Sequence, residues 1–180
     1  MKKSQIRKIV LKKRLNFNVK AKKINFYKLL LILKRETKNK KIGIYYPIGS
    51  EVSTLKLIEN LRKKKYKISL PVLENNFGMT FYEWNKKNPL KINKYGIPEP
   101  IKIKKFVPSI LIIPILAFDA NLNRLGYGGG FYDRFINKFE KTKKILKIGL
   151  ALSCQKINKV PTNKFDKRMN YILTENKVYK

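Results

Sequence analysis

An apolar run that leads into a glycine-rich turn limits the folds open to this chain. Residues 110–115 are apolar throughout, as in strands that are buried on both faces of a parallel sheet. Four glycines follow at Gly126, Gly128, Gly129 and Gly130, and a helical pattern covers residues 129–138. A buried strand, a tight turn and a helix in this order are typical of α/β proteins. We therefore predict a strand–turn–helix unit at the centre of an α/β fold.

The rest of the chain repeats this alternation of helices and strands. Helical spacing predicts helices over residues 2–15 and 24–35, and a third helix carries Leu55, Ile58 and Leu61 on its inner face, with Ser53 or Thr54 able to cap it. Apolar runs predict strands over residues 42–46, 67–73, 79–84, 145–152 and 171–174. Residues 75–78 and 85–105 read as loops over the working edge of the sheet. The prediction is one three-layer α/β domain over residues 1–180, with a mostly parallel sheet flanked by helices.

Histidine is absent and cysteine occurs once, as Cys154. The chain therefore cannot use Ser-His-Asp or Cys-His catalysis, a histidine-ligated metal, a multi-cysteine metal site or an internal disulfide. Catalysis here must rely on carboxylates, Lys, Arg, hydroxyls, backbone amides and bound cofactors.

The charge is strongly positive, with 43 basic and 11 acidic residues and a formal net charge of +32. One interpretation is a nucleic-acid partner, because a basic surface releases counterions from a polyanion. The other is compositional drift, since 36 of the 43 cations are Lys and the chain is also rich in Asn and Ile, whose codons are AT-rich. A dedicated phosphate reader would use more Arg. We favour drift and expect nucleic-acid binding to be incidental, with an RNA- or DNA-binding module as the alternative.

No export or membrane signal is visible in the sequence. The first 15 residues are charged throughout, and the apolar stretch 110–118 is much shorter than the roughly 20 residues that span a bilayer. The expectation is a cytoplasmic protein in a reducing compartment, with no membrane partner.

The glycine turn has the features of an anion cradle. Glycines let the backbone approach a phosphate, and the free amides of the following helix point at it. It is neither a Walker A loop nor a dinucleotide fingerprint. A tight turn that needs positive φ would also use glycine, but four glycines within five positions, beside Arg124, favour phosphate binding.

Several charged residues have two possible roles. Asp133 would either complement the helix dipole or bind Mg²⁺. Lys3 and Arg7 share one helical face that is either solvated or functional. Glu51 follows the strand at 42–46, at the end where open α/β sheets bind ligands.

Arg-Leu-Gly-Tyr-Gly-Gly-Gly-Phe-Tyr-Asp-Arg, residues 124–134, resembles the signature of the 5-formyltetrahydrofolate cyclo-ligase family, also called methenyltetrahydrofolate synthetase. The likeness covers nearly the whole chain. Its other parts are Pro-Ile-Leu-Ala-Phe-Asp at 114–119, Lys-Ser-Gln-Ile-Arg at 3–7, Tyr-Tyr-Pro-Ile-Gly-Ser-Glu-Val-Ser-Thr at 45–54, Gly-Ile-Pro-Glu-Pro at 96–100 and Val-Pro-Thr-Asn-Lys-Phe-Asp at 160–166. The glycine signature is highly specific, and the other parts occur in the right order. A different ATP-using enzyme on the same architecture is a weaker alternative, because the match extends beyond the glycine turn.

The resemblance implies an ATP-dependent enzyme that acts without histidine. ATP phosphorylates the formyl oxygen of 5-formyltetrahydrofolate, the neighbouring amine closes the ring, and phosphate departs to leave 5,10-methenyltetrahydrofolate and ADP. It also suggests a monomer and a Mg²⁺ cofactor.

Site residues follow from the resemblance by position. ATP would be bound by Lys3, Ser4, Gln5, Ile6, Arg7, Arg124, Leu125, Gly126, Tyr127, Gly128, Gly129, Gly130, Phe131 and Tyr132, with Arg124 as the catalytic residue. The folate would be bound by Tyr46 and Glu51, and by the backbone of Tyr127, Gly128, Gly129, Gly130 and Phe131. Asp133 and Asp166 would bind magnesium.

Three positions depart from the family pattern. Leu122 replaces a glycine in an Asp-x-x-Gly turn, Ser109 replaces an acid before the apolar strand, and Asn170 replaces an acid that follows Asp166 by a few residues. None of them is a residue assigned to ATP or folate.

Overall fold

The computed structural model describes residues 1–17 and 24–180. Within these residues the main element is an eight-stranded sheet with the strand order β12-β11-β10-β7-β1-β2-β3-β6. Its strands are β1 (Lys41–Ile44), β2 (Lys67–Leu73), β3 (Met79–Glu83), β6 (Lys105–Phe106), β7 (Ile110–Pro114), β10 (Leu146–Leu150), β11 (Tyr171–Leu173) and β12 (Val178–Tyr179). The central strands β11, β10, β7, β1 and β2 pair in parallel, and the others are added by antiparallel pairs. The prediction of a mostly parallel α/β sheet is confirmed.

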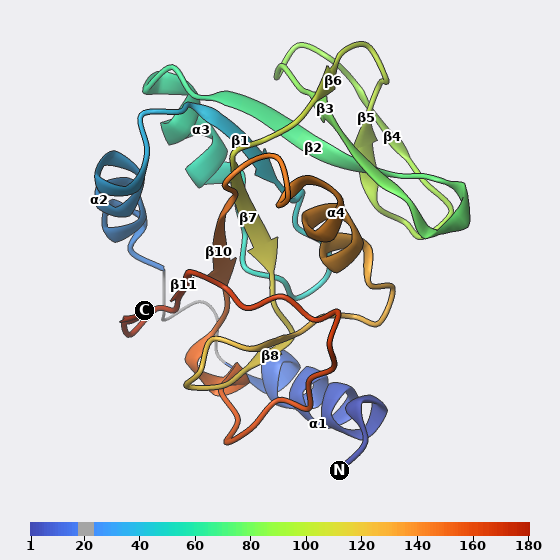
Figure 1. Cartoon of the computed structure of the whole chain (residues 1–180), viewed down its shortest axis with the longest axis vertical. Coiled ribbons are helices and arrows are strands. Elements are labelled where there is room, and N and C mark those ends of the chain that lie inside the picture. Colours follow the sequence, from blue (N-terminus) through green and yellow to red (C-terminus); the bar gives the residue numbers. More distant parts are fainter. Residues whose placement is uncertain (18–23) are drawn as a thin grey trace.

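Helices flank the sheet on both faces and across one end (Figure 1). They are α1 (Lys3–Asn16), α2 (Phe26–Glu36), α3 (Leu55–Lys63) and α4 (Phe131–Phe139). Helices α2 and α3 lie on one side of the sheet and α4 on the other, while α1 crosses the end toward which β1 and β7 point. None of the helices in the described ranges is long and apolar enough to cross a membrane.

Strand β7 explains why the sheet has two separate cores. Ile110 and Ile112 belong to the core beneath α2 and α3, together with Leu33 and Leu57. The alternate residues Leu111 and Ile113 belong to the core beneath α4, which also contains Phe81 and Phe135. Successive side chains of a strand point to opposite faces, so a run of apolar residues is needed where both faces are covered. The prediction that β7 is buried on both faces is confirmed.

The prediction of an irregular loop over residues 85–105 is wrong in part. Strands β4 (Leu90–Ile92) and β5 (Pro98–Pro100) form a small antiparallel sheet there. The turn between them is closed by the Asn93 side chain, whose Oδ1 accepts from the amides of Tyr95 and Ile97. Glu99 then ties β5 to the carboxyl end of β2 by accepting from the Leu73 amide at 2.7 Å. The apolar pattern in β4 and β5 is too short to show in the sequence.

Thr54 occupies the N-cap position of α3, but its side chain does not cap the helix. Its hydroxyl instead donates to the carbonyl of Tyr45 at 2.8 Å. Thr54 is completely buried, so this bond anchors the start of α3 to the end of β1. The prediction that Ser53 or Thr54 caps the helix is therefore wrong for the side chain of Thr54.

A buried carboxylate builds the turn that precedes the glycine segment. Strands β8 (Ala117–Phe118) and β9 (Arg124–Leu125) pair around this turn. Asp119 accepts hydrogen bonds from the amides of Asn121, Asn123 and Val160 at 3.0 to 3.1 Å. Within the turn, Leu122 has φ 63°, a left-handed conformation that favours glycine. Its buried side chain joins the core beneath α4, and burial offsets the backbone strain.

We expect Asp119→Ala to destabilise the protein by about 3 kcal/mol, because a buried amide that loses its acceptor costs about 1–3 kcal/mol and two part-buried amides lose theirs as well. For a chain of this size the melting temperature should fall by roughly 6–12 °C. Thermal unfolding followed by circular dichroism measures this. Asp119→Asn, which keeps an acceptor oxygen, should lose less. An alanine variant with the same melting temperature as the unmodified protein would show that the turn does not depend on Asp119.

Candidate functional site

The glycine turn connects β9 to α4 at the end of the sheet crossed by α1 (Figure 1). Gly128 has φ 115° and Gly130, the N-cap of α4, has φ 64°. Gly126 lacks positive φ, but a Cβ there would lie 3.2 Å from Nη1 of Arg124. Positive φ thus accounts for two of the four glycines, and a third, Gly129, has no room for a side chain because a Cβ there would collide with the Phe131 ring. Beyond the turn, the first amides of α4 lack intrahelical partners and favour an anion.

Three arginines from three different elements converge on this turn. Arg7 of α1 donates from Nε to the Gly126 carbonyl at 2.9 Å. Arg124 of β9 lies beside Gly126, and Arg134 of α4 donates to the Gly129 carbonyl. A guanidinium can bind a phosphate with two parallel hydrogen bonds. The turn is therefore surrounded by cations suited to phosphate oxygens.

Two carboxylates pair with cations at the same place. Asp133 Oδ1 lies 2.8 Å from Nη2 of Arg124, and Asp166 Oδ2 lies 2.6 Å from Nζ of Lys3. Asp133 Oδ1 also accepts from the amide of Lys167, the residue that follows Asp166. The structure therefore brings together two aspartates that are 33 positions apart in the sequence.

The two aspartates are suitable ligands for a Mg²⁺ ion that is bound together with a nucleotide. Mg²⁺ in nucleotide sites usually takes one or two carboxylates and completes its shell with phosphate oxygens and water. The described residues include no group of three or more acidic, histidine or cysteine side chains arranged to hold a metal. Asp133 and Asp166 could thus hold Mg²⁺ only together with phosphate oxygens, as in a metal–ATP complex.

Two buried polar atoms beside the turn have no hydrogen-bond partner among the described residues. They are Nε of Arg124 and the hydroxyl of Tyr132. Arg124 is 8% exposed, and its guanidinium carbon lies 5.8 Å from the centre of the Tyr132 ring. Burial raises the pKa of Tyr132, so its hydroxyl stays protonated at neutral pH. Unpaired buried donors are costly, and a polar ligand that enters the site would satisfy them.

Glu51 forms the other side of the site, in the segment that follows β1. Its Oε2 accepts from the Ile48 amide at 3.1 Å. Burial raises the pKa of Glu51, whereas hydrogen bonds from Ile48 and Tyr127 and the charge of Arg14 act to lower it. Burial, followed by the Glu51 charge, raises the pKa of Tyr127. The site thus contains a half-buried carboxylate in contact with the glycine turn.

The five residues predicted to bind ATP on α1 have three different environments. Lys3 and Arg7 point at Asp166 and at the glycine turn. Ser4 and Gln5 are exposed, and the Gln5 side chain accepts from the Lys2 amide at the start of the helix. Ile6 is buried in a small apolar cluster that α1 forms with Ala117, Leu125 and Val160. Only Lys3 and Arg7 therefore contribute charge to the site.

Among the described residues, Tyr46 makes no hydrogen bond or ring contact with the glycine turn. Its ring packs edge-on against Trp84, with the ring centres 6.2 Å apart. Tyr45, the preceding residue, is buried, and its pKa is raised by burial and then by the charge of Glu51. Tyr45 is therefore the tyrosine of this segment whose surroundings include Glu51.

Arg14 and Arg134 are two residues of the site that the sequence reasoning missed. Arg14 lies seven residues after Arg7, two helical turns further along the same face of α1. Arg134 lies in the first turn of α4, where the helix dipole disfavours a cation. The position of each arginine in its helix is visible in the sequence, but it is a weak indication of function in a chain with 43 basic residues.

The departures from the family pattern lie outside this cluster. Ser109 donates from both its hydroxyl and its amide to the carbonyl of Lys41, at the amino end of β1. Asn170 accepts from the amide of Lys147, next to the start of β10. Their side chains support the sheet at the end opposite the glycine turn.

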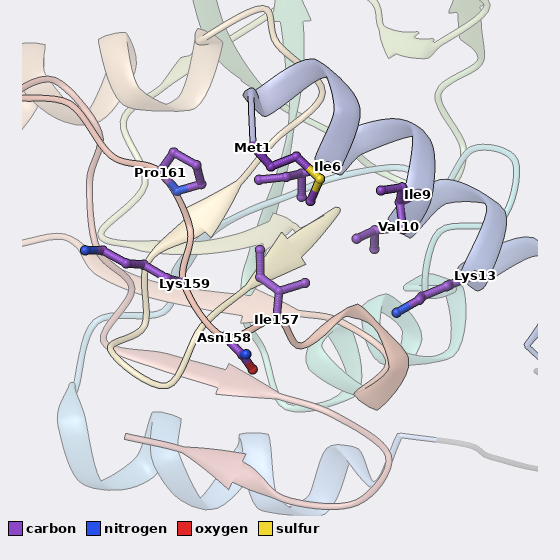
Figure 2. Close-up of a pocket in the computed structure, with 9 residues that line it drawn as sticks. All are labelled: Met1, Ile6, Ile9, Val10, Lys13, Ile157, Asn158, Lys159 and Pro161. Atoms are coloured by element: carbon purple, nitrogen blue, oxygen red, sulfur yellow. The ribbon is translucent and has the colours of Figure 1, made fainter.

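A cavity of about 620 Å³ lies between α1 and residues 157–161 (Figure 2). Ile6, Val10 and Lys13 line it from α1, on the face of the helix next to the one that carries Lys3 and Arg7. The glycine turn does not line this cavity. It is thus a neighbouring groove and separate from the cluster described above.

The aromatic run at residues 81–84 does not form an exposed base-stacking surface. Phe81 and Tyr82 are buried in β3. The Trp84 ring is covered by the guanidinium of Arg62, whose carbon lies 4.3 Å from the ring centre. The interpretation of this run as a strand that lines a cavity is confirmed, since Trp84 lines a second one, of about 410 Å³.

Comparisons with known proteins bear on the family and the fold of the chain. Residues 1–175 match the 5-formyltetrahydrofolate cyclo-ligase family. The chain is 37% identical over 145 residues to the 5-formyltetrahydrofolate cyclo-ligase of Haemophilus influenzae, covering 77% of this chain and 76% of that protein.

Two solved structures share the fold. The 5,10-methenyltetrahydrofolate synthetase of Aquifex aeolicus has a TM-score of 0.79 and 30% identity, over 100% of this chain and 93% of the other. The Mycoplasma pneumoniae 5,10-methenyltetrahydrofolate synthetase has a TM-score of 0.76 and 26% identity, over 96% and 98% of the two chains.

Proposed function

The chain belongs to the 5-formyltetrahydrofolate cyclo-ligase family, and on that basis we propose that ATP and folate meet at its glycine turn. It is a ligase that converts 5-formyltetrahydrofolate to 5,10-methenyltetrahydrofolate, and its dependence on ATP follows from the family. The observation that carries the proposed site is the convergence of Arg7, Arg124 and Arg134 on the turn that opens α4.

The ATP phosphates would lie along the glycine turn, against the first amides of α4. Arg7 and Lys3 would bind phosphate oxygens from α1, since both side chains already reach this region. Phosphoryl transfer needs little covalent help from the protein, and positioning and charge stabilisation supply most of the catalysis. Arg124 would supply that charge, because its buried guanidinium has one donor atom free of partners among the described residues.

Glu51 would bind the folate on the opposite side of the turn. A carboxylate can accept two hydrogen bonds from the amino and ring N–H groups of a pterin, and Glu51 lies beside Tyr127 of the turn. The formyl oxygen would then face the terminal phosphate. After phosphorylation, the neighbouring amine attacks the formyl carbon and phosphate leaves with the former formyl oxygen. The buried Tyr132 hydroxyl would donate to a polar group of one of the two ligands.

Asp133 and Asp166 would hold Mg²⁺ together with phosphate oxygens. The ion would neutralise charge on the polyphosphate. In the structure the same carboxylates pair with Lys3 and Arg124. Exchange of these partners would free both cations for the phosphates, so nucleotide binding and the two ion pairs are coupled.

A spectroscopic assay tests the proposal. Protein, ATP, Mg²⁺ and 5-formyltetrahydrofolate are mixed, and the absorbance of the methenyl product is followed against controls that lack each component. We expect growth of the signal that requires ATP and Mg²⁺. A flat trace from folded protein that binds ATP would contradict the proposal. RNA binding measured in about 0.2 M salt would then test the alternative, because backbone binding weakens strongly at that salt concentration.

We expect Asp133→Asn to raise the Mg²⁺ concentration needed for half-maximal turnover by about tenfold, since one carboxylate ligand is lost. Turnover measured across a Mg²⁺ titration at saturating ATP checks this. Glu140→Gln is the matched control, because Glu140 also pairs with a lysine of this region, Lys167, but lies at the far end of α4. A wild-type Mg²⁺ response in Asp133→Asn would show that Asp133 does not bind the metal. Its role would then be to complement the dipole of α4 and to pair with Arg124.

A further inference from the structure

Arg14 is a buried cation at the end of α1, with only 3% of its surface exposed. Its Nε donates to the hydroxyl of Ser50 at 2.8 Å, and its Nη1 donates to the hydroxyl of Tyr127 at 2.7 Å. The guanidinium carbon also lies 5.6 Å from the centre of the Tyr127 ring. Arg14 therefore joins α1, the segment that carries Glu51, and the glycine turn.

Its place on the helix continues the cationic face of the site. Lys3, Arg7 and Arg14 are separated by four and seven residues, which are close to one and two helical turns. Lys3 and Arg7 point toward the region proposed for phosphate. Arg14 lies at the other end of the same face, beside Ser50 and Tyr127, on the side proposed for folate.

The two side-chain hydrogen-bond partners of Arg14 among the described residues are neutral hydroxyls, although burying a guanidinium is costly unless its charge is compensated. The nearest acidic residue in the sequence is Glu51, one residue beyond Ser50, and the Arg14 charge acts to lower its pKa. The Tyr127 hydroxyl accepts from Arg14, so its own proton is free to be donated elsewhere. Arg14 is hydrogen-bonded to Tyr127, and Tyr127 acts to lower the pKa of Glu51, so the three residues form a chain from the cation to the carboxylate.

We propose that Arg14 is a positioning residue for the folate: it directs the Tyr127 hydroxyl toward Glu51 and sets the orientation and charge of the carboxylate that binds the pterin. This inference rests on the function proposed above, since it needs Glu51 to contact the folate. Arg14 is thus expected to affect the binding of folate, whereas Lys3 and Arg7, at the other end of the same helix face, are expected to bind ATP.

Burial raises the pKa of Glu51, and three groups act to lower it: the Ile48 amide, Tyr127 and Arg14. Arg14 of α1 favours its charged form, as does the hydrogen bond from Tyr127 of the glycine turn. Tyr45 after β1 and Tyr132 of α4 are neutral neighbours that feel the Glu51 charge. Loss of the Arg14 charge would therefore raise the pKa of Glu51 further above its ordinary value.

Arg14→Met tests the proposal, because methionine fills much of the same volume without charge. We expect KM for 5-formyltetrahydrofolate to rise about tenfold, KM for ATP to change less than about twofold, and the acid limb of kcat/KM for the folate to move to higher pH. Lys12→Met is the matched control, since Lys12 is exposed on the same helix and the charge change is identical. It should leave all three quantities unchanged.

Two more variants separate positioning from a purely structural role. Tyr127→Phe should reproduce the rise in KM, and the double variant should be little worse than either single one, because both break the same chain. Arg14→Lys should keep the acid limb in place and still raise KM, since it keeps the charge and loses the fork of donors.

An unmoved acid limb in Arg14→Met, or fully additive effects in the double variant, would overturn the proposal. If Arg14→Met does not fold, Arg14→Lys and Tyr127→Phe test the proposal in its place. A wild-type KM for folate in both of these variants would reject the proposal. Conversion by the unmodified protein, measured in the same assay, distinguishes failure of this inference from failure of the proposed function.

Discussion

Replacement of Arg124 by alanine is expected to lower turnover by about 100- to 1000-fold, the cost of removing one preorganised donor from developing negative charge. KM for 5-formyltetrahydrofolate should change only a few-fold, because Glu51 carries the proposed contact with the pterin. The large effect follows from burial. The Arg124 side chain is 6% exposed, so water cannot replace its charge beside the phosphates. Steady-state kinetics at saturating ATP and Mg²⁺ measures both quantities.

The same substitution at a remote arginine is the control for Arg124→Ala. Arg35 lies on α2 in a surface pair with Glu36, and Arg35→Ala should retain full turnover. Arg124→Ala also leaves Asp133 without its ion-pair partner, so its melting temperature must be compared with its activity. A variant that is folded and turns over at the wild-type rate would remove Arg124 from the ATP site.

Arg124→Lys adds a second comparison. Lysine keeps the charge, but a single ammonium cannot pair with Asp133 and reach a phosphate oxygen with a rigid fork of donors. Turnover should lie between those of the wild type and the alanine variant. Equal loss in both variants would indicate that geometry, and not net charge, determines the contribution of Arg124.

The sheet and the glycine turn could be predicted because their signals are local. Residues 110–115 are apolar at every position, and only a strand covered on both faces requires that pattern. Gly128 and Gly130 have positive φ, a conformation that glycine adopts with less strain than other residues. The proximity of the turn to a helix N-terminus follows from chain order alone.

Arg14 could not be singled out, because its role depends on tertiary neighbours. Ser50 and Tyr127 are 36 and 113 residues away in the sequence. The spacing of seven residues from Arg7 is the one local signal that separates Arg14 from Lys12 and Lys13, which precede it on the same helix and are exposed, and it is weak in so basic a chain. Burial of a cation is decided by what packs against it, and that is a property of the fold.

The role of Asp166 also depends on residues that are distant in the sequence. In the sequence it is an ordinary acid in a polar loop, and only the family resemblance selected it. In the fold, Asn163 shapes that loop by accepting from the Phe165 amide, and Asp166 lies against Lys3 of α1. Its partner is thus 163 positions away, beyond the reach of any motif.

Glu51→Gln is expected to lower kcat/KM for 5-formyltetrahydrofolate by roughly 10- to 100-fold, since a hydrogen bond to a charged group is worth about 1.5–3 kcal/mol. Glutamine keeps an oxygen that can accept from the Ile48 amide, so the segment after β1 should hold its shape. KM for ATP should stay close to wild type. Kinetics with each substrate varied in turn measures the difference, and Glu59→Gln, an exposed acid on α3, is the control.

The stability of Glu51→Gln should change in the opposite direction from its activity. Burial raises the pKa of Glu51 above its ordinary value of 4.5 in the folded protein, so folding favours the protonated carboxyl. The stability that Glu51 contributes is therefore fully present below pH 4.5 and is lost as the pH rises through the folded pKa. Glutamine mimics the protonated form and avoids this loss.

Glu51→Gln should accordingly melt above the wild type at neutral pH, and the two melting curves should converge toward pH 4, where the carboxyl is protonated in both states. Groups that are common to both proteins cancel in the comparison. Lower activity with higher stability at pH 7 cannot come from general damage to the fold. A variant that is less stable at pH 7, with a wild-type KM for folate, would instead make Glu51 a structural residue of the segment after β1 and would move the pterin site elsewhere.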